Sequence, residues 1–375
     1  MNADTDHGQY RTFAFLCGTR DYHAMDWFRS ACNIVELDRL VVLTDVRGGE
    51  GFTDLAQPGD NVVELVIIDR YLLDGQSKFG SQWRNLLKLA IFPIQAMRVR
   101  RFARQHPDTL FFAHSMYYLW LAWAAGVVFV GTPQGSDLLV KPWKSKIFHY
   151  LSAKALQAAK LVTVDSEAMA EAALKIANVR CAVVQNGVSV TEIQPRVFNT
   201  ATGCNIRSSI VSPRAITPLY RIAEIMSARN AMGEKGPPLC LFYPFSESEY
   251  LGKCRSLRHP EDLDLGRVDR ERMYQIFSEA RLVISIPLSD SSPRSVYEAI
   301  FCGAPVAICH NRYYDILPDD LKSRMILIDL DSPDWFERAL IEADVLIQSE
   351  PEFSAETWDM FDQRKSLKKI MELAA

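Results

Sequence analysis

The stretch LVISIPLSDSSPRSVYEAIFCGAPVAICHN, from Leu282 to Asn311, has the pattern of a strand, a loop, a helix and a second strand. Val283 to Pro287 is apolar and rich in β-branched residues, which predicts a buried strand. The loop supplies an N-cap serine, and Pro293 suits the first helical position. Gly303 suits the end of the helix, and Pro305 to Cys309 predicts the next strand. Such a unit aims backbone amides and a positive dipole end at the carboxyl edge of a sheet, where a phosphate is favoured.

Two acidic residues flank this turn, Asp290 in the loop and Glu298 on the helix, eight positions apart. A carboxylate beside a phosphate site is well placed to accept hydrogen bonds from sugar hydroxyls. For an isolated pair of this kind, a loop acid and a surface helix residue without a function are the more common explanation. Neighbouring motifs are therefore needed to choose between the two interpretations.

The whole stretch resembles the donor site of retaining glycosyltransferases of the GT-B fold, family 4. Seven residues separate Asp290 from Glu298, as in the family pattern, although the family usually has glutamate at the first position. The rest of the pattern, Ala-x-x-x-Gly-x-Pro-Val after the glutamate, is also present: Glu298, Ala299, Gly303, Pro305 and Val306. Pro293 stands where the family has a glycine amide. The resemblance implies that Asp290 binds hydroxyls of the donor sugar and that Glu298 binds the ribose.

Basic residues in the second half of the chain extend the resemblance to this family. Family members present an arginine after the first strand of this domain and a lysine shortly after it, and the two hold the donor diphosphate. Arg214 matches the arginine, whereas Tyr220 occupies the lysine position, so that Arg221 or Arg294 would supply the second charge. The donor-binding residues implied by the resemblance are Glu298, Arg214, Ser291, Ser292, Arg294, Ser295 and Arg221.

Two passages of the first half resemble the acceptor side of the same enzymes. Pro-Asp and a predicted strand lead to His114, a residue that also suits a purely structural role. A later Gly-Ser-Asp loop lies where many members carry an acceptor-side histidine, and Gln134 or Gly135 holds that position here. With the aspartate of this loop, the implied catalytic residues are Asp290, Arg214 and Asp137.

A chain of 375 residues, 48% of them hydrophobic, is long enough for two domains with separate cores. Strands and helices alternate in both halves, which predicts doubly wound sheets. The expected fold is therefore α/β, with two Rossmann-like domains facing across a cleft, as in GT-B enzymes. The domains are expected at residues 1–200 and 201–375, joined near residues 190–205, and the last helix is a candidate to pack back on the first domain.

Composition and charge limit the partners and the cellular location that can be expected for the protein. The net charge of −4 predicts no nucleic-acid partner, because nucleic-acid-binding domains are normally basic. The eight cysteines lack metal-ligand spacing and fit buried thiols better than disulfides. The polar N-terminus is unlike a signal peptide, so a cytoplasmic enzyme is expected. Leu110 to Pro133 is apolar enough for a membrane span, but its His and Gly residues divide it into strand, helix and strand.

A helix is predicted over residues 83–105, kinked or broken at Pro93. It carries a cationic cluster made of four arginines: Arg98, Arg100, Arg101 and Arg104. The cluster fits either a solvated face of a packed helix or a peripheral contact with the anionic inner face of a membrane.

The predicted function is transfer of a sugar from a nucleoside-diphosphate sugar to a hydroxyl acceptor, in cell-surface polysaccharide or glycolipid synthesis. The acceptor would be a saccharide or lipid-linked, and the nucleotide sugar is a substrate, so no cofactor is expected. Two Asp-x-Asp tripeptides, at residues 262–264 and 329–331, match the metal motif of the other glycosyltransferase fold, but no metal site is predicted from them. A sugar-nucleotide epimerase of the same fold and a catalytically silent sugar-nucleotide-binding module remain alternatives.

Overall fold

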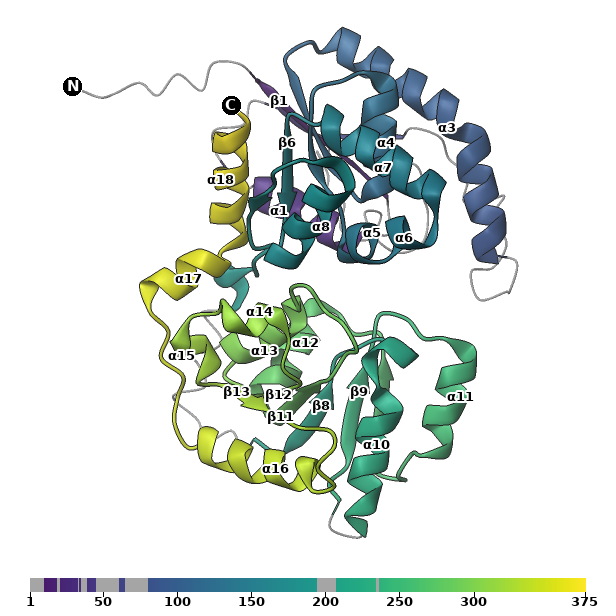
Figure 1. Cartoon of the computed structure of the whole chain (residues 1–375). Coiled ribbons are helices and arrows are strands. Elements are labelled where there is room, and N and C mark those ends of the chain that lie inside the picture. Colours follow the sequence, from purple (N-terminus) through teal and green to yellow (C-terminus); the bar gives the residue numbers. More distant parts are fainter. Residues whose placement is uncertain are drawn as a thin grey trace, which may run out of the picture. The chain divides into compact units, whose positions relative to one another are not determined.

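The computed structural model describes residues 10–18, 21–32, 34, 39–44, 61–64, 80–193, 207–233 and 236–375. The chain forms two compact units (Figure 1). The first unit contains Met1–Gln185 together with Gln363–Ala375, and the second contains Asn186–Asp362. The chain thus passes between the units twice, and its last helix belongs to the first unit.

The boundary falls within the Gln-Asn-Gly-Val segment, earlier than the expected residue 200. The physical reason is that Val188, Val190 and Ile193 are buried in the core of the second unit. The backbone amide of Val188 also donates a hydrogen bond of 2.7 Å to the carbonyl of Phe361, next to the second crossing. Most of the linker predicted for residues 190–205 lies outside the described residues.

The described strands of the first unit form a parallel sheet in the order β3-β2-β1-β4-β5-β6-β7. These strands are β1 (Thr12–Cys17), β2 (Arg39–Thr44), β3 (Asn61–Glu64), β4 (Thr109–His114), β5 (Phe129–Thr132), β6 (Leu161–Val164) and β7 (Ala182–Val183). The sequential order reverses between β1 and β4, which makes this pair the topological switch point of the sheet.

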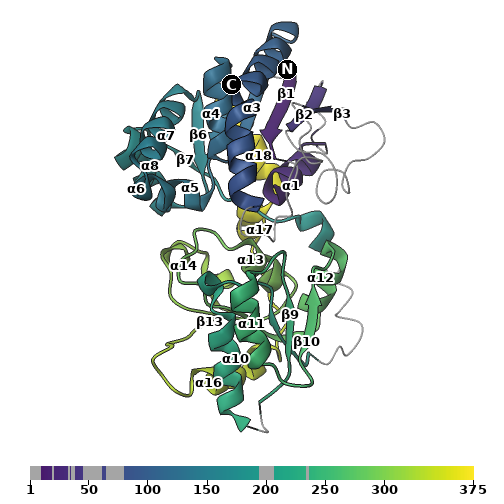
Figure 2. The same ribbon diagram turned by 90° about the vertical axis from the view of Figure 1, so that its right-hand side faces the viewer.

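Helices cover both faces of this sheet, which explains why its strands are apolar on both sides. The helices are α1 (Tyr22–Cys32), α3 (Gly80–Gln105), α4 (Met116–Ala125), α5 (Gly135–Leu139), α6 (Lys141–Lys144), α7 (Lys146–Ala158), α8 (Glu167–Ala177) and α18 (Gln363–Ala374). Phe13 and Phe15 point to the face covered by α1 and α18, whereas Ala14 and Leu16 point to the face covered by α3, α4, α7 and α8. In Figure 2, α18 lies beside α1, its packing partner.

The described strands of the second unit form a parallel sheet in the order β10-β9-β8-β11-β12-β13, with its switch point between β8 and β11. Its strands are β8 (Ser209–Ser212), β9 (Leu239–Phe242), β10 (Leu263–Gly266), β11 (Ala280–Ser285), β12 (Val306–Ile308) and β13 (Met325–Leu327). Together with the first sheet, this order confirms the predicted fold of two doubly wound Rossmann-like domains.

Two cores lie on opposite faces of the second sheet. Its helices are η2, a 3-10 turn (Pro218–Tyr220), α10 (Ile222–Ala231), α11 (Ser248–Ser256), α12 (Arg270–Ser278), α13 (Arg294–Phe301), α14 (Arg312–Asp315), α15 (Asp319–Lys322), α16 (Trp335–Leu346) and α17 (Ala355–Phe361). Leu282 and Ile284 of β11 face α10, α11 and α16, whereas Val283 faces α12 and α13.

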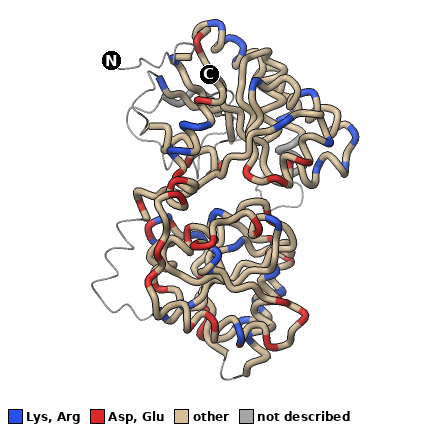
Figure 3. Tube along the Cα trace, turned by 60° about the vertical axis from the view of Figure 1, so that its left-hand side comes forward, with Lys and Arg blue, Asp and Glu red and all other residues tan. Residues whose placement is uncertain are grey.

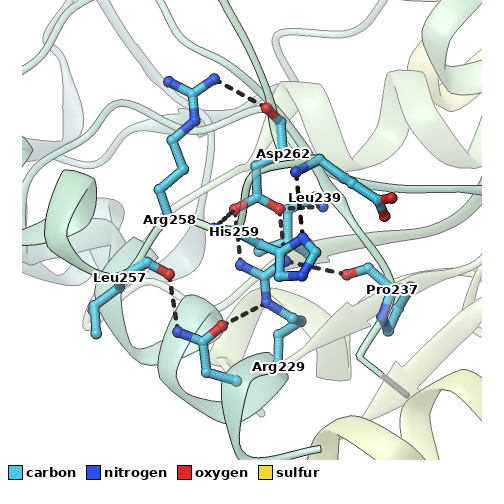
Figure 4. A network of polar contacts seen from close by, with 9 residues as sticks. Arg229, Pro237, Leu239, Leu257, Arg258, His259 and Asp262 are labelled. Carbon is cyan, nitrogen blue, oxygen red and sulfur yellow. Dashed lines mark hydrogen bonds and ion pairs between the residues drawn. The ribbon is translucent and has the colours of Figure 1, made fainter. Parts of the chain in front are cut away.

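A buried ion pair joins α10 to the start of β10 (Figure 4). The carboxylate of Asp262 accepts two hydrogen bonds from the guanidinium of Arg229, at 2.6 and 2.7 Å. It also accepts from the backbone amides of Leu239 and His259, both at 2.8 Å. Asp262 is the first acid of an Asp-x-Asp tripeptide, and its carboxylate is committed to these protein contacts.

Several elements differ from those that the sequence predicts. Helix α3 continues through Pro93 without a break, and the predicted last helix is divided into α17 and α18 at Asp362. The short strands β10 and β13 and the helices α10 and α11 were not predicted.

Charged residues of both signs occur in both units, and the described cysteines differ in burial. Figure 3 shows Lys and Arg interspersed with Asp and Glu along both units. Of the seven cysteines in the described ranges, Cys17, Cys240, Cys254 and Cys302 are buried and Cys32 is exposed. No described helix combines the length and the apolar character that crossing a bilayer requires, and the segment from Leu110 to Pro133 folds as β4, α4 and β5.

Candidate functional site

The switch point of the second sheet gathers the residues around which the sequence prediction was built. The chain leaves β8 and β11 in the same direction, and the helices that follow them go to opposite faces of the sheet. Ligands of doubly wound sheets bind in the crevice that such a divergence creates at the carboxyl ends of the strands. Arg214 follows β8 by two residues, and Asp290 follows β11 by five.

Arg214 and Asp290 form a close ion pair at this crevice. Nη2 of Arg214 donates to Oδ2 of Asp290 at 2.5 Å, and Nη1 donates to the hydroxyl of Ser295 at 3.1 Å. The amide of Ser291 donates to the other Asp290 oxygen at 3.0 Å. The two charged side chains are only 10% and 16% exposed. One guanidinium therefore brings together residues predicted from motifs that lie far apart in the sequence.

Tyr220 holds the place where the family carries a lysine. The guanidinium carbon of Arg214 lies 4.4 Å from the centre of the Tyr220 ring, a cation–π contact. Tyr220 thus orients Arg214 instead of contributing a second charge. The neighbouring Arg221, predicted to bind the donor, adopts a left-handed backbone with φ of 55° and starts α10 through its carbonyl. The role of its side chain remains a prediction.

Glu298 is nearly buried on α13 and is held by two donors. Its Oε1 accepts from Nε of Arg294 at 3.1 Å and from the hydroxyl of Tyr274 at 3.2 Å. Burial raises the pKa of Tyr274, and the negative charge of Glu298 raises it further, so the hydroxyl stays protonated. Both of these contacts use the same carboxylate oxygen. Arg294, predicted as a donor-binding residue, therefore also positions the glutamate.

The start of α13 differs in detail from the prediction. The carbonyl of Pro293 accepts from the amides of Val296 at 2.9 Å and Tyr297 at 3.3 Å, so Pro293 is the N-cap residue. The predicted serine N-cap with proline at the first helical position is therefore wrong by one residue. Proline provides no amide, and the first-turn amides of Arg294 and Ser295 are those that lack a carbonyl one turn earlier. These two amides carry the positive end of the helix dipole.

Buried polar atoms without partners mark the same crevice. Among the described residues, no acceptor lies within hydrogen-bonding distance of Nε of Arg214, and the hydroxyls of Ser212 and Ser285 also have no partner. The two serines are the last residues of β8 and β11. Because buried polar groups are normally satisfied, such a concentration is typical of a place where a ligand completes the hydrogen bonding.

The switch point of the first sheet holds a second polar group. Asp21 follows β1, and its Oδ2 lies 2.8 Å from Nδ1 of His114 at the end of β4. The side-chain amide of Gln134 donates to the same oxygen at 3.1 Å. Sequence reasoning noted His114 and Gln134 but missed Asp21, whose only signal is its position just after the first strand and its glycine. Ser115, next to His114, has φ of 70°, an unusual conformation for a residue with a side chain.

The Asp21–His114 pair should make stability depend on pH. Burial opposes charge on both groups, but their mutual attraction outweighs it, so the pKa of His114 is raised above 6.5 and that of Asp21 is lowered from 3.8 to about 2. Charged His114 contributes fully to the stability of the folded chain below pH 6.5, and this contribution is lost as the pH rises through the folded-state pKa of the histidine. Charged Asp21 contributes fully above pH 3.8, and this contribution is lost as the pH falls through the folded-state pKa of the aspartate. The pair therefore stabilises most between these two values.

The measurement is the difference in melting temperature between the parent and His114→Gln across pH. We expect the largest difference inside that window and a shrinking difference in alkaline buffer. His149→Gln, which changes a partly exposed histidine of α7, is the matched control. A difference that stays constant into alkaline pH would show that His114 is uncharged in the folded chain.

Asp137, predicted as catalytic, is buried at the start of α5. Its Oδ2 accepts from the amides of Met116 at 2.8 Å and Gln134 at 3.1 Å, and its Oδ1 accepts from Lys141 at 2.7 Å. These contacts complete a capping box and tie α5 to the start of α4. Asp137 belongs to the first unit and Arg214 to the second. The catalytic role of Asp137 remains a prediction.

Among the described residues, neither a metal-ligating cluster nor the pocket of the second unit includes any predicted site residue. Within the described ranges, no three His, Cys, Asp or Glu residues are grouped so that they could hold a metal ion. A pocket of about 370 Å³ in the second unit lies at α15 and α17, where Asp320 and Thr357 line it, and none of the predicted site residues is among its lining. We regard the strand-end crevice as the candidate site because the convergent charges lie there.

One family model and several solved structures are similar to this chain. The family model described as Glycosyltransferase Family 4 matches residues 63–192. This match lies in the half of the chain that precedes Arg214, whereas the donor-site resemblance lies after it. No curated protein sequence matches the chain.

Solved structures similar to this chain have two-domain folds of the same kind. The Anabaena protein HepE, in complex with UDP and glucose, has a TM-score of 0.70 at 16% identity, over 96% of this chain and 98% of that one. The N-terminal domain of trehalose-6-phosphate phosphatase from Candida albicans has a TM-score of 0.68 at 10% identity, over 97% and 96%. Sucrose-phosphate synthase from Thermosynechococcus elongatus has a TM-score of 0.65 at 11% identity, over 97% and 96%. At sequence identities of 10% to 16%, this similarity shows a shared fold and nothing more.

Proposed function

We propose that this chain is a GT-B glycosyltransferase similar to family 4, and that it transfers a sugar from a nucleoside-diphosphate sugar to a hydroxyl acceptor with retention of configuration. The observation that carries the proposal is the Arg214–Asp290 pair at the switch point, beside the first turn of α13. A diphosphate requires a cation and amide donors, and a sugar requires a carboxylate, and this crevice offers all of them.

The charge and hydrogen-bonding groups of each residue determine its proposed role. Arg214, with Nε unsatisfied among the described residues, binds the diphosphate and stabilises the charge that grows on it as the glycosyl bond breaks. Asp290 then exchanges part of its contact with Arg214 for hydroxyls of the donor sugar. Ser291, Ser292 and Ser295 supply hydroxyl and amide donors around the phosphates.

The reaction balances without a separate base in the second unit. The bond from the anomeric carbon to the β-phosphate oxygen breaks, and the acceptor oxygen forms the new bond to the same carbon. The leaving diphosphate takes the acceptor proton, as the family resemblance implies. Asp137 of the first unit is assigned to the acceptor side, and neither a metal ion nor a cofactor is required by this scheme.

The acceptor is proposed to be a saccharide or a lipid-linked sugar, and the product a precursor of cell-surface polysaccharide or glycolipid. HepE binds UDP and glucose, and the trehalose-phosphate synthase of Burkholderia xenovorans was solved with glucose-6-phosphate. These ligands support a nucleotide sugar as donor and a sugar as acceptor. The test is release of nucleoside diphosphate and formation of product over a panel of nucleotide sugars and sugar acceptors. Nucleoside diphosphate release without any product, or an epimerised donor, would contradict the proposal.

Glu298→Gln should weaken binding of the nucleoside diphosphate by about 1 to 3 kcal/mol, because a charged acceptor of ribose hydroxyl hydrogen bonds becomes neutral. The change also removes the partner of a nearly buried arginine, Arg294. Calorimetric titration with nucleoside diphosphate measures the effect. The matched control is Glu224→Gln, which alters another glutamate that accepts from a tyrosine hydroxyl, at 3.0 Å from Tyr250. Equal affinities of Glu298→Gln and the parent would move the ribose site elsewhere.

A catalytically silent binding module is the second candidate, and one observation favours it. Tyr220 replaces the second cation that the family uses, and its ring covers the remaining arginine. Donor binding without transfer over the whole acceptor panel would favour this alternative. Tyr220→Lys offers a direct check: restored or increased turnover in that variant would identify the tyrosine as the reason for silence.

A further inference from the structure

The first unit contains a long segment whose charge is opposite to that of the whole chain. Residues 80–164 contain eleven Lys and Arg and only two acids, Asp108 and Asp137, although the chain has a net charge of −4. Asp137 is buried and paired with Lys141, so it offsets that one cation and leaves the other ten. This segment supplies α3 to α7, which are neighbours on one face of the first sheet.

Large apolar side chains are exposed in the same region. On α6 and α7, Trp143 is 55% exposed, Ile147 is 74% exposed and Tyr150 is 60% exposed. Lys144, Lys146 and Lys154 are exposed among them, and residues 138–164 contain no acid. Within residues 138–164 these exposed apolar side chains have only basic charged neighbours along the sequence, and exposed apolar patches indicate an interaction surface.

Helix α3 continues this surface. Leu89 and Met97 are exposed along it, and Arg98, Arg101 and Arg104 follow at its C-terminal end. The predicted cluster of four arginines is not uniform, because Arg100 donates from Nε to the carbonyl of Ala125 at 2.9 Å and so caps α4. Helix α4 contacts both α3 and α7, and Figure 2 shows the three helices across one side of the unit. We name the exposed residues of α3, α6 and α7 the basic face.

We propose that the basic face binds an anionic lipid surface, with Trp143, Ile147 and Tyr150 entering the headgroup region and the lysines contacting lipid phosphates. Amphipathic surfaces that lie on membranes combine Lys and Arg with Trp, Tyr and aliphatic residues in this way. A nucleic-acid surface would use the cations but has no place for Ile147 and Met97. This inference goes beyond the proposed function and does not depend on which sugar is transferred.

The test is flotation of the full chain with vesicles of phosphatidylcholine alone and of phosphatidylcholine mixed with phosphatidylglycerol. We expect binding to the anionic vesicles only, and weakening by salt, because exposed charges are screened. Lys144→Gln/Lys146→Gln should lower the partition coefficient by roughly fivefold for each lysine. Ile147→Ser should lower it by roughly tenfold, through loss of apolar contact.

The second unit offers matched controls. Lys253→Gln/Arg255→Gln on α11 removes two exposed cations, and Ile341→Ser on α16 removes an exposed isoleucine. Both controls should bind vesicles like the parent. Donor-dependent release of nucleoside diphosphate, measured on the same preparations without vesicles, separates failure of this inference from failure of the proposed function.

Three results would overturn the inference. The first is equal binding to neutral and anionic vesicles, or none to either. The second is binding to double-stranded DNA as strong as to vesicles with Ile147→Ser behaving like the parent, which would indicate a polyanion surface. The third is self-association of the parent that Ile147→Ser abolishes, without vesicle binding, which would assign the face to a second copy of the chain.

Discussion

Arg214→Ala is expected to lower turnover roughly 100- to 1000-fold, the range typical of losing one positioned donor to a developing negative charge. The guanidinium is almost buried and already holds Asp290 and Ser295 in place, so its loss also releases the carboxylate assigned to the donor sugar. Donor affinity should fall less than turnover, because the charge on the diphosphate is greatest when the glycosyl bond is breaking. Nucleoside diphosphate release at saturating donor and acceptor measures turnover, and calorimetry measures affinity.

Two further variants make this result interpretable. Arg214→Lys keeps the charge but not the planar fork that bridges Asp290 and Ser295, so its turnover should lie between those of the parent and the alanine variant. Arg281→Ala is the matched control, since Arg281 also belongs to the β11 region but pairs with Asp344 at 2.6 Å near the start of that strand. Parent-like turnover in Arg214→Ala would place the phosphate site elsewhere.

Asp262→Asn is expected to lower the free energy of unfolding of the second unit by about 3 to 5 kcal/mol, the usual cost of leaving a buried charge without its partner. Both Arg229 and Asp262 are buried, and the carboxylate accepts four hydrogen bonds. An amide side chain cannot accept at both of its terminal atoms and carries no charge. Denaturant unfolding, followed by a signal specific to the second unit, measures the loss.

The control for this prediction is the partly exposed pair Arg281–Asp344, whose side chains are 28% and 46% exposed. Asp344→Asn should cost no more than about 1 kcal/mol, because water and salt screen a pair at the surface. Replacing both buried partners, as in Arg229→Met/Asp262→Leu, should recover part of the stability lost by the single change. A loss in Asp262→Asn no larger than in Asp344→Asn would contradict the structural role assigned to the Arg229–Asp262 pair.

Apolar elements could be predicted from the sequence, and short polar ones could not. Strand β12, Val306–Ile308, lies within the residues predicted for it, 305–309, because a short run of apolar side chains after a helix end leaves little choice. Strand β10, Leu263–Gly266, contains an aspartate and a glycine and becomes a strand only by pairing with β9. Helix α3 continues through Pro93, although proline normally interrupts a helix. In such elements tertiary contacts decide the structure.

The candidate site, too, could be predicted from the sequence only in part. Motif spacing predicted Asp290, Glu298 and Arg214 separately, but their contacts depend on β8 and β11 being neighbours at the switch point, which no local pattern encodes. The packing of Tyr220 against Arg214 and the pairing of Asp21 with His114 depend equally on strand order. Arg229 could not be recognised as the partner of Asp262, because 33 residues and a crossover separate them.

The central claim is that the strand-end crevice of the second unit binds the donor. Calorimetric titration with a panel of uridine, guanosine and adenosine diphosphate sugars tests it most directly, with the parent and with Arg214→Glu compared side by side. The account predicts that at least one nucleotide sugar binds the parent at a single site and that the reversed charge abolishes this binding. Saturable binding that is unchanged in Arg214→Glu, or no binding of any member of the panel to the parent, would contradict it.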